Sequence, residues 1–261
     1  MASDPILEAK GLTMRFGGLT AVKSFSAAIP RGGIVGLIGP NGAGKTTCFN
    51  MITGFYKPSE GQVRFQGEDI TGTPPHRVCR SGIARTFQNI RLFANETVLE
   101  NVMIGGHLRQ KTGWWQAVLC LPANRREERA VAERARELLK VVGLEEFAGE
   151  KANSLPYGAQ RRLEIARALA TRPSFLLLDE PAAGMNPNET VELMGFIREI
   201  RTSFDLTVLL IEHDMKVVMG ICEHIWVLDY GETIAEGPPE AIKSDPKVIK
   251  AYLGEEAVPH A

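Results

Sequence analysis

The sequence has few cysteines and no excess of positive charge. Its cysteines lack the C-x-x-C spacing of zinc sites and redox pairs, so we expect neither a disulfide framework nor a zinc site. A reducing compartment fits this pattern. Lysine and arginine together number 30 against 31 acidic residues, and this balance gives no electrostatic footprint for nucleic acid. The four cysteines are Cys48, Cys79, Cys120 and Cys222.

Long apolar runs are also missing. No run approaches the roughly 20 residues that a helix needs to cross a bilayer, and the N-terminus lacks the charged-then-apolar pattern of a signal peptide. We find no internal repeat and no low-complexity tract. The 261 residues are 44% hydrophobic and 23% charged, which is ordinary for a globular chain. We therefore expect any membrane role to come through a partner protein.

The most informative stretch runs from Ile34 to Asn50. The apolar residues Ile34 to Ile38 predict a buried parallel strand, and a glycine-rich loop and a helix start follow it. The loop matches G-x-x-x-x-G-K-[ST] in the strand–loop–helix context in which this pattern binds phosphate. We call this segment the phosphate loop. It consists of Gly39, Pro40, Asn41, Gly42, Ala43, Gly44, Lys45, Thr46 and Thr47.

Each residue type in the phosphate loop has a chemical reason. The glycines let successive backbone N–H groups point at an anion, and the helix that begins near Gly44 adds its positive end. Lys45 would bridge the β- and γ-phosphates of a nucleotide, and the Thr46 hydroxyl would bind Mg²⁺. Thr47 would lie on the α-phosphate side. The alternative is a chance glycine turn before a helix, which eight matching positions make a poor explanation.

Two further apolar runs end in polar residues. Residues 175–178 predict a buried strand that leads into Asp179 and Glu180. Residues 207–211 predict another strand, which His213 follows closely. Because ligands of open α/β sheets bind at the carboxyl ends of the strands, we expect these side chains beside the phosphate loop. Asp179 would hold Mg²⁺ and Glu180 would polarise a water molecule for attack on the γ-phosphate. The alternatives are a solvent-facing acid pair and a structural histidine.

The flanking segments are less specific. Residues 6–35 alternate apolar and polar positions around glycine turns and predict antiparallel strands. Phe16 ends one of these strands and is either a core aromatic or a platform that stacks on adenine. Gln88 ends a strand-like segment and by itself could be any polar loop residue.

Residues 94–157 have dense mixed charge and helical periodicity, which predicts a mostly helical insertion. Within it, the apolar stretch 114–122 either packs internally or faces a membrane partner.

With these residues in view, the chain resembles the ATP-binding cassette of ABC transporters over essentially its whole length. Within that family it is similar to the ATPase subunits of branched-chain amino-acid (Liv-type) importers. The motifs that carry the resemblance are the phosphate loop and residues 85–89, 157–167, 179–187, 211–215 and 251–254.

The resemblance implies a role for each matching residue. Glu180, His213, Gln88 and Lys45 would act in catalysis, with Glu180 as the base and His213 holding the γ-phosphate. Thr46, Gln88 and Asp179 would contact Mg²⁺. Phe16 and the phosphate loop would bind ATP. The signature segment, normally Leu-Ser-Gly-Gly-Gln, would complete the ATP site of the opposite subunit in a head-to-tail dimer. In this chain the resemblance implies that Leu155, Pro156, Tyr157 and Gly158 would contact that ATP.

The resemblance also implies a fold and partners. We expect an α/β fold with the parallel sheet of P-loop (RecA-like) NTPases, an antiparallel β subdomain and an inserted helical subdomain. Residues 1–93 and 162–236 would form the core, 94–161 the helical signature subdomain and 237–261 a C-terminal tail. The expected partners are a second ATPase subunit, in a heterodimer or a homodimer, and transmembrane permeases at the cytoplasmic face of the inner membrane. A periplasmic binding protein would act indirectly, and no nucleic acid is expected.

Two departures from the family pattern bear on mechanism. Pro156 replaces the signature serine and offers neither a hydroxyl nor an N–H to a phosphate. Asn186 replaces the aspartate of the loop that meets its copy across the dimer, and keeps capping ability without charge. The alternative functions are an ABC ATPase for another substrate, including an exporter, a chromosome-organising ATPase and a small-molecule kinase. The modest helical insert and the signature helix argue against the last two.

Overall fold

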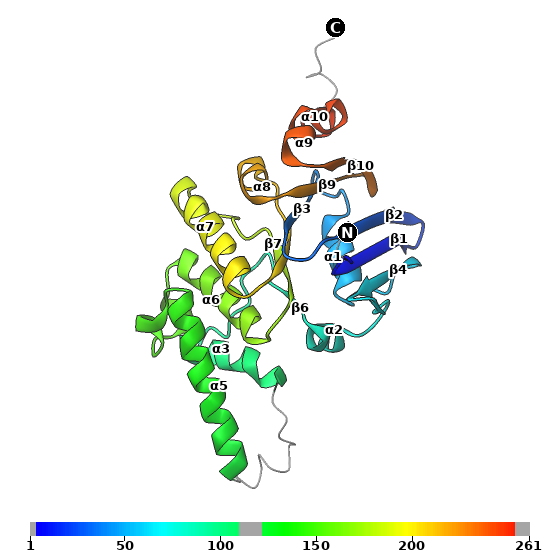
Figure 1. Cartoon of the computed structure of the whole chain (residues 1–261). Coiled ribbons are helices and arrows are strands. Elements are labelled where there is room, and N and C mark those ends of the chain that lie inside the picture. The colour runs from blue at the N-terminus through cyan, green and yellow to red at the C-terminus, as the bar shows by residue number, and fades with distance from the viewer. Residues whose placement is uncertain (1–3, 110–121, 254–261) are drawn as a thin grey trace. The chain divides into compact units, whose positions relative to one another are not determined.

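The computed structural model describes residues 4–109 and 122–253. The chain divides into two compact units. The first consists of Met1–Val78 and Ser174–Ala261, and the second of Cys79–Pro173. The apolar stretch that begins at Trp114 lies almost entirely outside the described residues. Figure 1 shows the elements of both units in chain order.

The strands of the first unit form two sheets. One sheet has the order β2-β1-β4-β5, with antiparallel pairing throughout. In the other, the strands of this unit follow the order β10-β9-β3-β8-β7. The strands are β1 (Leu7–Phe16), β2 (Leu19–Ile29), β3 (Ile34–Ile38), β4 (Glu60–Phe65), β5 (Glu68–Asp69), β7 (Phe175–Asp179), β8 (Thr207–Ile211), β9 (His224–Asp229) and β10 (Glu232–Gly237).

Parallel pairing sets the position of the strand ends. β3 pairs with β8 and β9, and β7 pairs with β8, all in parallel. Every residue of β3, β7 and β8 is buried, as their continuous apolar runs predict for strands covered on both faces. Figure 1 shows α7 and α8 on one side of these strands and α1 on the other. The prediction of a P-loop NTPase sheet with an antiparallel β sheet beside it is confirmed.

In the first unit, the helix after the phosphate loop begins at Lys45, as the sequence predicts. α7 (Pro187–Ser203) has Asn186 as its N-cap, and the Asn186 side chain accepts hydrogen bonds from the N–H groups of Asn188 and Glu189, both at 3.0 Å. Such a cap stabilises a helix by about 1 kcal/mol. The remaining helices are α1 (Lys45–Ile52), α2 (Pro75–Ser81, which spans the boundary between the units), α8 (Met215–Ile221), α9 (Pro239–Ser244) and α10 (Pro246–Leu253).

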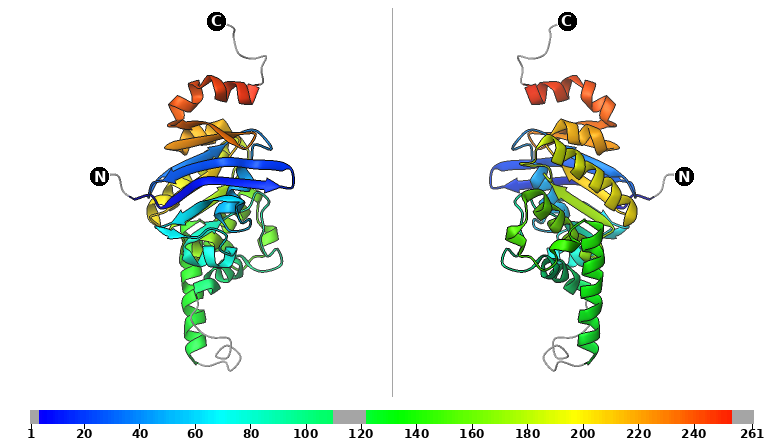
Figure 2. Two further views of the ribbon diagram at one scale, coloured as in Figure 1. Left: turned by 90° about the vertical axis from the view of Figure 1, so that its right-hand side faces the viewer. Right: turned by 90° about the vertical axis from the view of Figure 1, so that its left-hand side faces the viewer.

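The second unit is mostly helical, as predicted. Its long helix α5 buries Ala135 and Leu138 among α3 and α6 and ends before Gly143, whose φ of 70° is left-handed. The turned views of Figure 2 show α5 as the longest helix of this unit. Its elements are β6 (Ile83–Arg85), α3 (Val98–Gly106), η1 (His107–Arg109), α5 (Pro122–Val141), η2 (Glu145–Phe147), η3 (Ala152–Ser154) and α6 (Tyr157–Ala170). Across 4–109 and 122–253, none of the helices combines the length and the apolar character that a bilayer crossing requires.

Candidate functional site

The phosphate loop connects the end of β3 to the start of α1 and needs its glycines. Gly39, Gly42 and Gly44 have φ values of 150°, 82° and 102°, a region that other residues rarely adopt. A Cβ on Gly39 would lie 2.1 Å from the carbonyl oxygen of Leu228. Because backbone surrounds the loop at this distance, even alanine would force it to shift. Glycine at position 39 is therefore required both by the loop's own backbone conformation and by the close approach of β9.

Lys45 holds the first turn of this loop. Its Nζ donates hydrogen bonds to the carbonyl oxygens of Gly39 and Pro40, at 2.7 Å and 2.9 Å. The residue is buried, and burial lowers the pKa of its ammonium group, while the charges of Glu180 and Asp179 act in the opposite direction. The ammonium therefore lies within electrostatic reach of both carboxylates. The ends of β3 and β7 meet here as predicted.

Glu180 and His213 lie together at the same edge of the sheet. His213 Nδ1 is 3.4 Å from Glu180 Oε2. The backbone N–H of Glu180 donates to the carbonyl of Ile211 at 2.9 Å, which joins the end of β7 to the end of β8. Glu180 also has a left-handed φ of 46°, which directs the chain sharply away from the strand. The structure thus brings Lys45, Glu180 and His213 to one place.

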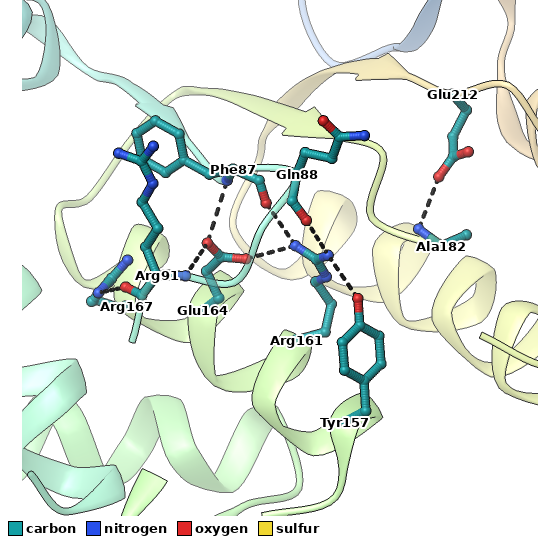
Figure 3. A network of polar contacts seen from close by, with 9 residues as sticks. All are labelled: Phe87, Gln88, Arg91, Tyr157, Arg161, Glu164, Arg167, Ala182 and Glu212. Carbon is teal, nitrogen blue, oxygen red and sulfur yellow. Dashed lines mark hydrogen bonds and ion pairs between the residues drawn. The ribbon is translucent and has the colours of Figure 1, made fainter. Parts of the chain in front are cut away.

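Sequence reasoning missed Glu212 as a functional candidate. Its carboxylate is fully buried, and its two oxygens accept hydrogen bonds from the N–H groups of Ala182 at 2.8 Å and His213 at 3.2 Å. Figure 3 shows the contact with Ala182. Glu212 therefore ties the loop after Glu180 to the loop that carries His213. The available signal was its position directly after the five buried residues of β8, where a charged residue needs partners.

We expect Glu212→Ala to lower the free energy of unfolding by about 1–3 kcal/mol, because the buried N–H of Ala182 and the part-buried N–H of His213 would lose their acceptor. Glu212→Gln keeps the shape of the side chain and removes the negative charge of its carboxylate, so it tests the effect of that charge on stability. Burial raises the pKa of this carboxyl above 4.5 despite its backbone hydrogen bonds, so the folded protein binds the proton more tightly than the unfolded chain. Its contribution to stability is complete below pH 4.5 and is lost as the pH rises through the raised pKa.

Urea unfolding of the nucleotide-free protein between about pH 4 and pH 8 measures this effect. Wild-type protein should lose stability relative to Glu212→Gln as the pH increases. A difference between the two proteins that is independent of pH would contradict the assignment of this proton to Glu212.

The remaining predicted residues lie in both units. Phe16 ends β1 in the first unit and contacts Tyr56 edge-on, at 5.4 Å between ring centroids. The residue is 43% exposed, which argues against a core role and leaves the ring available to a ligand. In the second unit, Gln88 follows β6, and the signature residues Leu155 to Gly158 lie at the N-terminus of α6. Pro156 occupies the N-cap position of that helix and makes no side-chain cap.

Comparison with known proteins agrees with this geometry. The family model described as ABC transporter matches residues 22–183, more than half of the chain. The chain belongs to the ABC transporter family. A second model, described as branched-chain amino acid ATP-binding cassette transporter, matches residues 232–258. The predicted family resemblance is confirmed, and with it the ATPase class of the chain.

Individual relatives in the ABC transporter family are similar over nearly their full length. The chain is 52% identical to BraF of Pseudomonas aeruginosa, a high-affinity branched-chain amino acid transport ATP-binding protein. It is 49% identical to LivG of Escherichia coli, which has the same description. Each alignment covers 97% of this chain and 99% of the relative. A crystal structure of an ABC transporter cassette in its ADP conformation matches 96% of the chain, with 34% identity and a TM-score of 0.83.

As an ABC ATPase, the chain binds and hydrolyses ATP. The residues at this edge also fit a magnesium ion. Mg²⁺ prefers oxygen donors and is usually held by one or two carboxylates together with substrate phosphates. Within the described residues, no cluster of three or more His, Cys, Asp or Glu side chains could hold a metal alone. Asp179 at the end of β7 and Thr46 at the start of α1 would be the oxygen donors for such an ion.

Proposed function

We propose that this chain is the ATP-hydrolysing subunit of an importer for branched-chain amino acids. The observation that carries the proposal is the meeting of Lys45, Glu180 and His213 at the carboxyl edge of one parallel sheet. The alignment of residues 232–258 with a family of branched-chain amino acid transporters supports the substrate class. The names of the similar proteins BraF and LivG support it further.

In this proposal Phe16 stacks on adenine and residues 39–47 surround the phosphates. Glu180 accepts a proton from the water whose oxygen bonds to the γ-phosphorus, while the bond from that phosphorus to the ADP oxygen breaks. A proton on Nδ1 of His213 would point at Glu180, which leaves Nε2 for a γ-phosphate oxygen. Thr46, Asp179 and Gln88 would hold Mg²⁺, which when bound neutralises charge on the phosphates.

The proposal includes an assembly. The signature segment, within a helical subdomain of residues 94–161, would contact ATP held by a second ATPase subunit. Residues 1–93 and 162–236 would bind this chain's own ATP, with 237–261 as a tail. Permeases would hold the pair at the cytoplasmic face of the inner membrane, and a periplasmic binding protein would deliver the amino acid. The two ATPase subunits would close on each other only while the γ-phosphate is present, so hydrolysis would reopen the dimer.

Co-purification with candidate permeases followed by ATPase assays tests this function. Leucine, isoleucine or valine, presented with the binding protein, should stimulate hydrolysis by the assembled transporter. Stimulation by an unrelated substrate alone would favour the alternative, an ABC ATPase for another import or export system.

Pro156→Ser addresses the two ATP sites of the assembly. If the site completed by Pro156 is the slower one, restoring a hydroxyl should raise steady-state ATPase by roughly twofold, as both sites then turn over. Serine is also a favourable N-cap for α6, so the fold should tolerate it. An ATPase rate equal to that of the wild type would count against unequal sites.

A further inference from the structure

A fully buried ion pair lies on α6, one turn after the signature segment. Arg161 and Glu164 are 0% and 1% exposed, and Arg161 Nη1 lies 2.8 Å from Glu164 Oε2. Two charges removed from water require that their remaining donors and acceptors be satisfied. The position of those other partners therefore shows what the pair holds in place.

The other hydrogen bonds of the pair go to residues 87–91, which we call the glutamine loop. Arg161 Nη1 donates to the carbonyl of Phe87 at 2.8 Å, and Nη2 donates to the carbonyl of Gln88 at 2.9 Å. Glu164 Oε1 accepts from the N–H groups of Phe87 at 3.3 Å and Arg91 at 3.4 Å. Figure 3 shows all four contacts. One ion pair thus binds the backbone at both ends of the loop.

The same guanidinium also contacts the signature segment. Arg161 Nη2, which binds the Gln88 carbonyl, lies 3.4 Å from the hydroxyl of Tyr157. Figure 3 shows the carbonyl of Gln88 facing Arg161 while its side chain extends away from it. The backbone of Gln88 is therefore fixed to α6, and the direction of its side-chain amide follows from that attachment.

Further contacts hold the loop, both within itself and to α6. The guanidinium of Arg91 lies 4.4 Å from the ring centroid of Phe87, and that of Arg85 lies 5.3 Å from it, both within the range of cation–π attraction. Arg167, two turns along α6 from the signature segment, donates to the carbonyl of Arg91. The glutamine loop is thus held by its own cation–π contacts and is attached to α6 through its backbone.

Stability alone does not account for a charged pair at this position. Apolar residues of similar volume often stabilise a protein as well as a buried ion pair does, or better. They cannot, however, bind two carbonyls and two N–H groups of a neighbouring loop. The pair therefore provides a fixed arrangement of the loop that packing alone would not specify.

We propose that Arg161, held by Glu164, is a positioning residue that couples the signature segment to Gln88. A nucleotide contact at Tyr157 or Gly158 on one side would reach Gln88 through this single guanidinium. The inference rests on the proposed roles of Gln88 and of the signature segment. Through it, the ATP bound by the opposite subunit would control hydrolysis at this chain's own site.

The double variant Arg161→Met with Glu164→Met tests the coupling in the assembled transporter. Since both charges are removed together, neither is left buried alone, so the variant should fold; the four backbone groups that lose their partners should lower the melting temperature by only a few degrees. We expect kcat for ATP to fall by about tenfold or more with KM changed by less than about twofold. The matched control is Glu133→Met with Arg136→Met, an exposed pair at the same spacing on α5, which should keep wild-type kinetics.

A Gln88→Ala background separates the possible explanations. If Arg161 acts through Gln88, the Met pair should cause no further loss of kcat when Gln88 is already alanine. Losses that multiply in the combined variant would overturn the coupling while leaving the role of Gln88 intact. A Gln88→Ala protein with wild-type kcat would overturn the proposed role of Gln88 and the coupling together.

A second substitution keeps the test decisive if the Met pair does not fold. Arg161→Lys retains the charge but lacks the planar fork that reaches two carbonyls and a carboxylate at once. Its kcat should fall with little change in KM, and this loss should also disappear in the Gln88→Ala background. Wild-type kcat in Arg161→Lys would overturn the inference.

Discussion

Glu180→Gln should reduce ATP hydrolysis by roughly 10²–10⁴-fold and leave ATP binding intact. A positioned general base contributes about this factor, and glutamine has the shape of glutamate without its basicity. The left-handed backbone at Glu180 and its N–H bond to Ile211 do not depend on the side-chain charge, so the loop should keep its form. Loss of the charge also weakens the contact with His213 Nδ1 at 3.4 Å.

Steady-state and single-turnover ATPase of the assembled transporter measure this effect, together with the nucleotide that remains bound. ATP rather than ADP should accumulate on the variant. Glu199→Gln, an exposed residue of α7, is the matched control and should hydrolyse ATP at the wild-type rate. Substantial residual hydrolysis by Glu180→Gln would remove Glu180 from the role of base.

Lys45→Met should weaken ATP binding by about 2–5 kcal/mol, or roughly 30- to 5,000-fold in Kd. The Lys45 ammonium lies against the backbone of the phosphate loop, where it donates to two carbonyls. Methionine keeps the aliphatic stem of lysine without the charge. Burial lowers the pKa of Lys45, so its charged form is disfavoured in the folded protein. Because the loss of its two hydrogen bonds opposes this relief, we expect the nucleotide-free variant to have the stability of the wild type within about 1 kcal/mol.

Equilibrium nucleotide binding and thermal unfolding of the full-length chain test both expectations. The control is Lys23→Met, which removes an exposed lysine paired with Glu232 at 2.6 Å and should leave ATP affinity unchanged. If Lys45→Met bound ATP as tightly as the wild type, the phosphate loop could not act as proposed. If it bound weakly and also unfolded at lower temperature, the loss of affinity would reflect damage to the fold.

The local parts of this protein follow from short stretches of sequence. Residues 34–50 contain a buried strand, a glycine loop and a helix start, and the structure has these three parts within the predicted bounds. Asn186, which keeps capping ability in place of the family aspartate, caps α7. These features depend on φ and ψ preferences and on hydrogen bonds between residues a few positions apart, which is why sequence pattern alone finds them.

The meeting of the strand ends was also predictable, for a topological reason. Apolar runs at 34–38, 175–178 and 207–211 read as parallel strands, and the carboxyl ends of such strands share one edge. Lys45, Glu180 and His213 come from these three ends. The roles in catalysis that the family resemblance implies for them stay predictions until the variants above are measured.

By itself, the sequence determined the glycine loop and the buried strands at 34–38, 175–178 and 207–211, because these follow from local geometry and apolar periodicity, and its motifs identified the family. Only the tertiary structure decided which buried polar groups pair. Glu212 binds Ala182 from 30 residues away, and Arg161 binds the backbone of Phe87 from 74 residues away. A buried charge takes its partner from whichever segment packing brings within 3 Å, and no local pattern contains that information.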